Sequence, residues 1–243
     1  MPEPRKATVR QECFLPHPGY PHSLRRLDFE AAMQDVCDYF NDVNSYLMGK
    51  GFRRLDDMIR PAGLSGMISD MLTDSLGQHA RALTPNLQHN GHPDLLVRDR
   101  YPGDAAASGE DGVEVKASRK SGGAVDTHGA RKQVLCVFTY EVDNRSWIAA
   151  QDREPFTFRE VYINEVETGD FRLNNRGELG TRTATLHKDG LKKWRQDPVY
   201  LDMPFNENTE PWRSPTGKMP KKGSTKKTTK PGDADEQPTL DGH

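Results

Sequence analysis

The sequence is poor in cysteine and holds no long apolar run. Only three of its 243 residues are cysteines, and no two of them form a Cys-x-x-Cys pair. Such scattered cysteines are typical of reduced thiols and exclude a zinc ribbon. No apolar stretch approaches the roughly 18–20 residues of a membrane helix, and residues 1–10 lack the apolar core of a signal peptide. We therefore expect a cytoplasmic protein with no membrane partner.

Several sequence motifs that are typical of nucleotide-binding proteins and hydrolases are also missing. The chain has no P-loop, no G-x-G-x-x-G and no G-x-S-x-G sequence, so we expect neither a nucleotide cofactor nor a Ser-His-Asp hydrolase. Lys and Arg number 34 and Asp and Glu number 36, which leaves a net charge of −2. A nucleic-acid-binding protein often carries excess positive charge. Any such charge here must be local.

Two amphipathic helices are predicted in the first third of the chain. Apolar residues recur at helical spacing over 28–47, with Asp28 as the expected N-cap and Gly49 as the stop. A second apolar stripe covers 64–76 and follows Pro61, a residue that suits a helix start. We expect both helices to pack against a core.

Strand patterns follow the second helix. Residues 95–97 are apolar, residues 113–117 alternate with a period of two, and 133–142 is the most continuous apolar run of the chain. The remaining expected elements are a flexible connection over 99–112, weaker strands over 159–166 and 182–186, and a short helix over 189–195. These patterns predict an α+β or α/β fold with helices packed on a central mixed sheet.

Composition divides the chain into three parts. Residues 1–23 are rich in proline and are predicted to form an irregular arm, and residues 24–212 are predicted to form the folded domain. Residues 213–243 contain a lysine block followed by an acidic end, a composition that predicts disorder. The lysines favour either a non-specific DNA tether, which gains affinity by counterion release, or a solubilising tail.

The candidate chemistry lies in two short motifs, Pro93-Asp94 and Glu114-Val115-Lys116. Asp94 and Glu114 would converge if their strands pair as a hairpin, and alternation places Lys116 on the same face as Glu114. Hydrolysis of a phosphodiester needs a divalent ion to neutralise the phosphate and acidify a water, and Mg²⁺ prefers carboxylate oxygens. A neighbouring lysine can hold the attacking water or stabilise developing charge.

This pair of motifs resembles that of the PD-(D/E)xK nuclease superfamily, which includes many type II restriction endonucleases. The resemblance covers about residues 64–142: a helix, the PD strand, the ExK strand and a further buried strand. It implies a restriction-endonuclease-like fold in which Asp94 and Glu114 bind the metal and Lys116 is the catalytic lysine. It also implies Mg²⁺ as cofactor, with Mn²⁺ able to substitute.

The same resemblance suggests a third acid from the preceding helix. Asp70 and Asp74 are the options, and Asp74 lies nearer the apolar stripe on a 3.6-residue period. By resemblance, the chain is a double-stranded DNA endonuclease of a restriction or phage-defence system that acts as a homodimer. Repair and RNA cleavage stay open as settings.

Basic residues follow the ExK motif directly and suit one wall of a DNA cleft. Arg and Lys contact phosphates and can read guanine edges, whereas the alternative is an exposed polar loop. The candidate contacts are Arg119, Lys120, His128 and Arg131. Gln133 either points into the site or ends a strand ladder.

Two alternatives to a nuclease remain. In the first, Pro93-Asp94 is a turn and Lys116 is a solvated strand residue paired with Glu114. In the second, the chain is a non-catalytic DNA-binding module on the same fold, although the intact set of two acids and a lysine argues against it. His92 precedes Pro93, and without a second His or Cys at zinc spacing we interpret it as a loop residue.

Overall fold

The computed structural model describes residues 3–120, 125–127, 129–174 and 183–202, all within one compact unit, Met1–Pro204. The predicted DNA contact of His128 and the predicted disorder of 213–243 lie outside the described residues. In the described ranges, no helix is both long enough and apolar enough to cross a membrane.

The first long helix, α1, spans Arg26–Gly49 and ends at the predicted stop. The prediction of Asp28 as the N-cap is wrong. Asp28 is the third helical residue, and its carboxylate accepts the backbone N–H of Arg25 at 2.8 Å. A carboxylate in that position satisfies a donor that the helix itself leaves without a partner, and the N-cap is Arg25, three residues before the predicted one.

The second long helix, α3, spans Pro61–His79 and begins with proline, whose missing N–H is harmless in the first turn. The short helix α2, Leu55–Met58, precedes it. Near the end of the described chain, α4 spans Lys188–Trp194, close to its predicted bounds, and the ring of His187 accepts the N–H of Gly190 to cap it.

The main sheet has six strands in the order β1-β2-β3-β5-β6-β9. These strands are β1 Leu83–Pro85, β2 Leu95–Val97, β3 Gly112–Ser118, β5 Gln133–Glu141, β6 Thr157–Val166 and β9 Tyr200–Leu201. β3 and β5 run parallel, and the other described neighbours run antiparallel. The fold is therefore mixed α+β with a mixed central sheet, as the sequence predicted at that level.

A second, three-stranded sheet has the order β4-β8-β7. Its strands are β4 Asp126–Thr127, β8 Thr183–Leu186 and β7 Phe171–Asn174. The sequence pattern indicated only β8; β4, with two residues, is too short to show a periodicity of its own.

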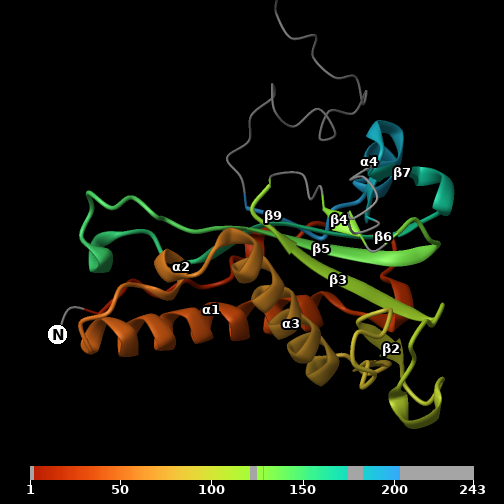
Figure 1. Ribbon diagram of the computed structural model, residues 1–243, viewed down its shortest axis with the longest axis horizontal. Helices are drawn as coiled ribbons and strands as arrows, with labels where there is room; N and C mark the ends of the chain where they lie inside the picture. Colours follow the sequence, from red (N-terminus) through yellow and green to blue (C-terminus); the bar gives the residue numbers. More distant parts are fainter. Residues whose placement is uncertain (1–2, 121–124, 128, 175–182, 203–243) are drawn as a thin grey trace, which may run out of the picture. The chain divides into compact units, whose positions relative to one another are not determined.

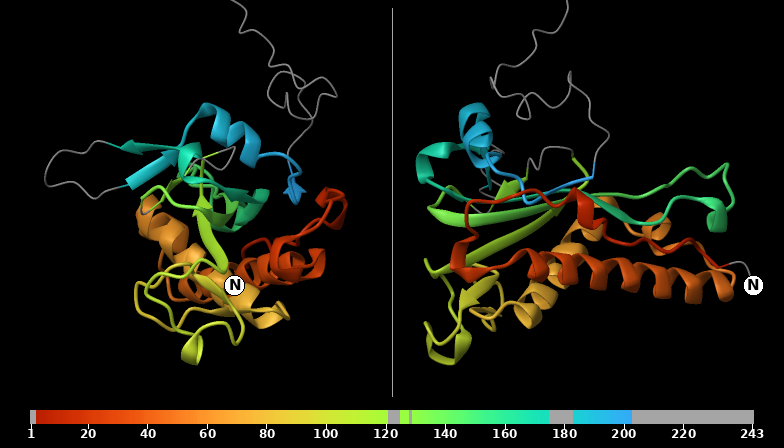
Figure 2. Two further views of the ribbon diagram at one scale, coloured as in Figure 1. Left: turned by 90° about the vertical axis from the view of Figure 1, so that its right-hand side faces the viewer. Right: turned by 180° about the vertical axis from the view of Figure 1, so that it is seen from behind.

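The two faces of the main sheet are covered by different layers. Figure 1 shows α1 and α3 on one face and α4 with β4 and β7 on the other, and Figure 2 shows the same layers from two further sides. Val115 lies on the α1–α3 face, whereas Leu135 and Trp194 belong to the core on the opposite face. Because side chains alternate along a strand, Glu114 and Lys116 share the face of their register partners Leu135 and Val137.

Candidate active site

The candidate site begins where β2 meets β3. The pairing of these strands is short, Leu95 with Val113 and Leu96 with Gly112. Gly112 permits it: a Cβ there would lie 2.0 Å from the carbonyl oxygen of Leu95 and 2.6 Å from Cγ of Pro93. No side chain tolerates such contacts. The glycine therefore lets the segment that carries Asp94 lie directly against the strand that carries Glu114.

Beyond Val113, side chains bind the edge of β3 that faces away from β5. The N–H of Val115 donates to Oδ2 of Asp94 at 2.8 Å. One pair further along, the N–H of Ala117 donates to Oγ of Ser69, from α3, also at 2.8 Å. These two bonds satisfy strand donors that no neighbouring strand meets. The bond from Val115 also fixes the Asp94 carboxylate relative to the strand that carries Glu114 and Lys116.

The three residues of the predicted catalytic set come together. Nζ of Lys116 lies 3.1 Å from Oδ2 of Asp94 and 2.6 Å from Oε1 of Glu114, so a single ammonium contacts both carboxylates. The Glu114 side chain is 5% exposed, and those of Lys116 and Asp94 are 21% and 28% exposed. The cluster is thus largely buried, with Asp94 on its more open side.

A fourth side chain joins this cluster. Nδ1 of His92 lies 2.7 Å from Oε2 of Glu114, whose Oε1 contacts Lys116, and the imidazole is only 14% exposed. The interpretation of His92 as a plain loop residue is therefore incomplete. Its position two residues before Asp94 was the only sequence signal, because the contact to Glu114 joins residues 22 positions apart.

The charged groups of the cluster shift one another's pKa values. Burial opposes ionisation of Glu114, but the hydrogen bond with His92 and the charge of Lys116 prevail and lower its pKa to about 2. Burial, reinforced by the nearby Glu114, raises the pKa of Asp94 despite the favourable Lys116. For Lys116, the two carboxylates outweigh burial and raise the pKa. At neutral pH the lysine is charged and Glu114 is ionised.

The donor set is suited to a hard divalent cation. Asp94 and Glu114 supply carboxylate oxygens that already share one cationic partner, and Mg²⁺ typically takes one or two carboxylates and fills its shell with water and phosphate oxygens. Within the described ranges, no three His, Cys, Asp or Glu side chains gather as a ready metal site. The cationic partner that Asp94 and Glu114 share is the Lys116 ammonium.

Asp74 and Gln133, which the sequence also proposed for the site, differ in burial: Asp74 is exposed and Gln133 is buried. Asp74 is exposed on α3, as is Asp70, and α3 contacts the edge of β3 through Ser69. Gln133 begins β5 and lies on the same sheet face as Glu114, one alternate position before Leu135. It is 5% exposed, and no described group pairs with its Nε2.

The predicted DNA-binding loop starts at the end of β3. Arg119 and Lys120 are exposed there, and the backbone N–H of Lys120 donates to Oγ of Ser118 at 3.1 Å. Arg131 is half-buried just before β5. The loop therefore extends from the strand that carries Glu114 and Lys116, with two exposed cationic side chains at its start.

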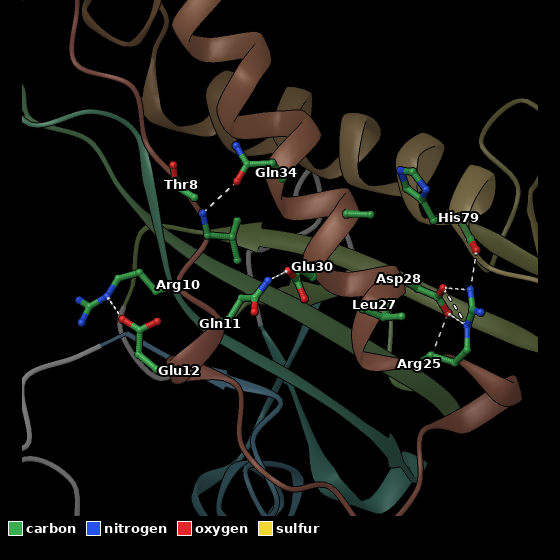
Figure 3. A pocket seen from close by; sticks show the side chains of 12 residues that line it. Thr8, Arg10, Gln11, Glu12, Arg25, Leu27, Asp28, Glu30, Gln34 and His79 are labelled. Carbon is green, nitrogen blue, oxygen red and sulfur yellow. Dashed lines mark hydrogen bonds and ion pairs between the residues drawn. The ribbon is translucent and has the colours of Figure 1, made fainter.

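A groove of the described structure lies away from the cluster. It lies between the N-terminal segment and the start of α1, with His79 at one side (Figure 3), and its volume is about 900 Å³. Its polar side chains pair with one another: Arg25 with Asp28, and Gln11 with Glu30 at 2.7 Å. None of the cluster residues lines it. Groove size alone therefore does not identify the candidate site.

Comparison with known proteins adds no relative: no protein-family model, no curated protein and no solved structure matches this chain. The functional proposal therefore depends on the cluster itself.

Proposed function

We propose that this protein is a Mg²⁺-dependent endonuclease that hydrolyses phosphodiester bonds of double-stranded DNA, with a restriction-endonuclease-like fold of the PD-(D/E)xK type. One observation carries the proposal. The carboxylates of Asp94, just before β2, and of Glu114, on β3, both lie within 3.1 Å of Nζ of Lys116, and the three residues follow the order of the motif. A solvated strand lysine beside a turn aspartate would not lie between two carboxylates with only 21% of its side chain exposed.

The roles follow from position. Asp94 and Glu114 would hold the Mg²⁺, which when bound neutralises the scissile phosphate and acidifies a water. Lys116 would orient the attacking water and stabilise the charge that develops on the phosphate. The partly exposed Asp94 marks the side from which substrate would enter.

The substrate is proposed to be DNA because exposed cationic side chains directly follow the strand that carries Glu114 and Lys116. Arg119 and Lys120 are exposed directly after β3, where they would contact backbone phosphates. A restriction or phage-defence role in the cytoplasm, and a homodimer that places two sites on the two strands, complete the proposal. Mn²⁺ would substitute for Mg²⁺.

Cleavage of supercoiled plasmid tests the proposal. The purified full chain should nick or linearise plasmid with Mg²⁺ and stop when EDTA is added. Glu114→Gln and Lys116→Ala should each lose activity by at least about 100-fold, a typical loss for a charge-stabilising group. The matched controls are Glu110→Gln and Lys192→Ala, both exposed, and these should cut like the wild type.

The outcomes separate the alternatives. Undiminished cutting by Glu114→Gln or Lys116→Ala would reject the site. A wild-type chain that binds plasmid but does not cut it with Mg²⁺ or Mn²⁺ would reject the enzyme and support a DNA-binding module.

A further inference from the structure

The contact between His92 and Glu114 lies outside the two motifs that carry the proposed function. Glu114 divides its carboxylate between two partners: Oε1 contacts Lys116 at 2.6 Å and Oε2 contacts Nδ1 of His92 at 2.7 Å. An ionised carboxylate only accepts hydrogen bonds, so Nδ1 of His92 carries the proton and donates it. A short bond to an ionised acceptor is among the stronger hydrogen bonds of proteins.

This bond fixes the rotation of the Glu114 carboxylate. A glutamate side chain has three torsions, and the terminal one has a broad preference when nothing holds the carboxylate. With Oε2 held by His92, Oε1 is turned toward the ammonium that also contacts Asp94. The hydrogen bond from His92 therefore leaves Oε1 of Glu114 directed toward the position of a shared cation.

The position of His92 is itself firmly supported. Its carbonyl oxygen accepts the N–H of Gly109 at 2.6 Å. Asn86, just after β1, binds the same segment twice, through its backbone N–H to the carbonyl of Asp94 at 2.9 Å and through Nδ2 to the carbonyl of Pro93 at 2.9 Å. Bonds at His92 itself and at the two residues that follow it thus hold the imidazole against Glu114.

We propose that His92 is a positioning residue that orients the Glu114 carboxylate for the divalent cation and so raises the affinity of the site for that ion. The proposal rests on the proposed function, in which Glu114 is a metal ligand. Residues that hydrogen-bond to metal ligands typically contribute about 10–100-fold to metal affinity.

Calorimetric titration of Mg²⁺, and separately of Ca²⁺, into the full chain tests this role without relying on cleavage. His92→Ala should weaken binding of each ion by about 10–100-fold. His92→Asn should bind within about threefold of the wild type, because the asparagine amide nitrogen occupies nearly the position of Nδ1 and donates the same bond. His89→Ala, an exposed histidine three residues earlier, is the matched control and should not change affinity.

Thermal melting of each variant checks the fold, and His92→Asn keeps the test valid if His92→Ala does not fold. Equal affinity in the wild type and His92→Ala overturns the positioning role. A loss of affinity in His92→Asn as large as in His92→Ala also overturns it, because the imidazole would then act in a way that a donor alone does not replace. A wild-type chain that binds neither ion instead rejects the proposed function, and that result is distinct from the other two.

Discussion

The carboxylate of Asp94 accepts the backbone N–H of Val115, the residue that lies between Glu114 and Lys116 on β3. The first acid of the cluster is thereby bonded to the strand that carries the other two members. Because the donor is the backbone, the bond depends on how closely the segment before β2 approaches β3. That approach depends in turn on Gly112.

Gly112→Ala should disrupt the cluster from outside it. The added methyl group would meet Leu95 O at 2.0 Å, so the strands must separate, at a cost of about 1–3 kcal/mol in unfolding free energy. Asp94 would then lose its bond to Val115, and plasmid cleavage should fall with stability. Urea denaturation and the plasmid assay measure the two effects.

The control for this variant is Gly66→Ala. Gly66 lies inside α3, and a Cβ there would meet nothing within 4 Å. The same methyl group should stabilise the helix by about 0.5–1 kcal/mol and leave cleavage unchanged. If Gly112→Ala behaves like Gly66→Ala, the close approach of β2 does not position the site.

Lys116→Met should leave two neighbouring carboxylates without their common cation. We expect a loss of about 1–3 kcal/mol in EDTA, less than for a fully buried pair because Asp94 is partly exposed. Added Ca²⁺ should raise the melting temperature of this variant more than that of the wild type, since the ion replaces the missing charge. Differential scanning calorimetry gives both values.

The control is Lys192→Met, which removes an exposed lysine from α4. Its melting temperature should match that of the wild type with and without Ca²⁺. An equal response of Lys116→Met and wild type to Ca²⁺ would show that the two carboxylates do not share a cation.

Gln133→Leu should stabilise the free protein. Nε2 of Gln133 is buried without a partner in the described part of the chain, and such a donor costs about 1–3 kcal/mol, whereas leucine has a similar volume and no donor. If the amide points into the site and contacts DNA, one of the two alternatives that the sequence left open, the variant should also bind plasmid more weakly in a gel-shift assay. Gln78→Leu on the exposed side of α3 should bring no such gain, and a stability loss in Gln133→Leu would contradict the prediction.

The pH dependence of stability should reflect Asp143, which follows β5. Its side chain accepts Nε of Arg145 at 2.8 Å and the N–H of Glu154 at 3.0 Å, and the bonds to Arg145 hold the pKa of Asp143 below its usual range. A depressed folded pKa gives stability that is present above the unfolded value of about 3.9 and is lost as the pH falls toward the folded value.

Asp143→Asn should therefore lose about 1–2 kcal/mol at pH 7, in line with the loss of hydrogen bonds to a charged group. The difference from the wild type should shrink as the pH falls below about 4, because the unfolded chain then takes up a proton that native Asp143 binds only at lower pH. Urea denaturation across this pH range measures it. Asp152→Asn, at an exposed position of the same loop, should track the wild type at every pH, and a constant gap for Asp143→Asn would contradict the linkage.

Local patterns predicted most of the long elements. The apolar stripes of α1 and α3 and the alternation of β3 arise from neighbours three, four or two positions apart, so the printed residues suffice to find them. The same alternation places Glu114 and Lys116 on one face. The N-cap of α1 was missed because Asp28 satisfies the Arg25 N–H from inside the helix, an arrangement that the apolar pattern does not record.

The amino-acid sequence by itself determined which side chains are available to the site and that two of them, Glu114 and Lys116, point the same way. Only the tertiary structure decided that Asp94 reaches them, that His92 holds Glu114, and that Gln133 is buried nearby. The physical reason is distance along the chain. The bond of His92 to Glu114 and that of Asp94 to Val115 each span more than 20 residues, and they form only when strand pairing at Gly112 removes the space between the two segments.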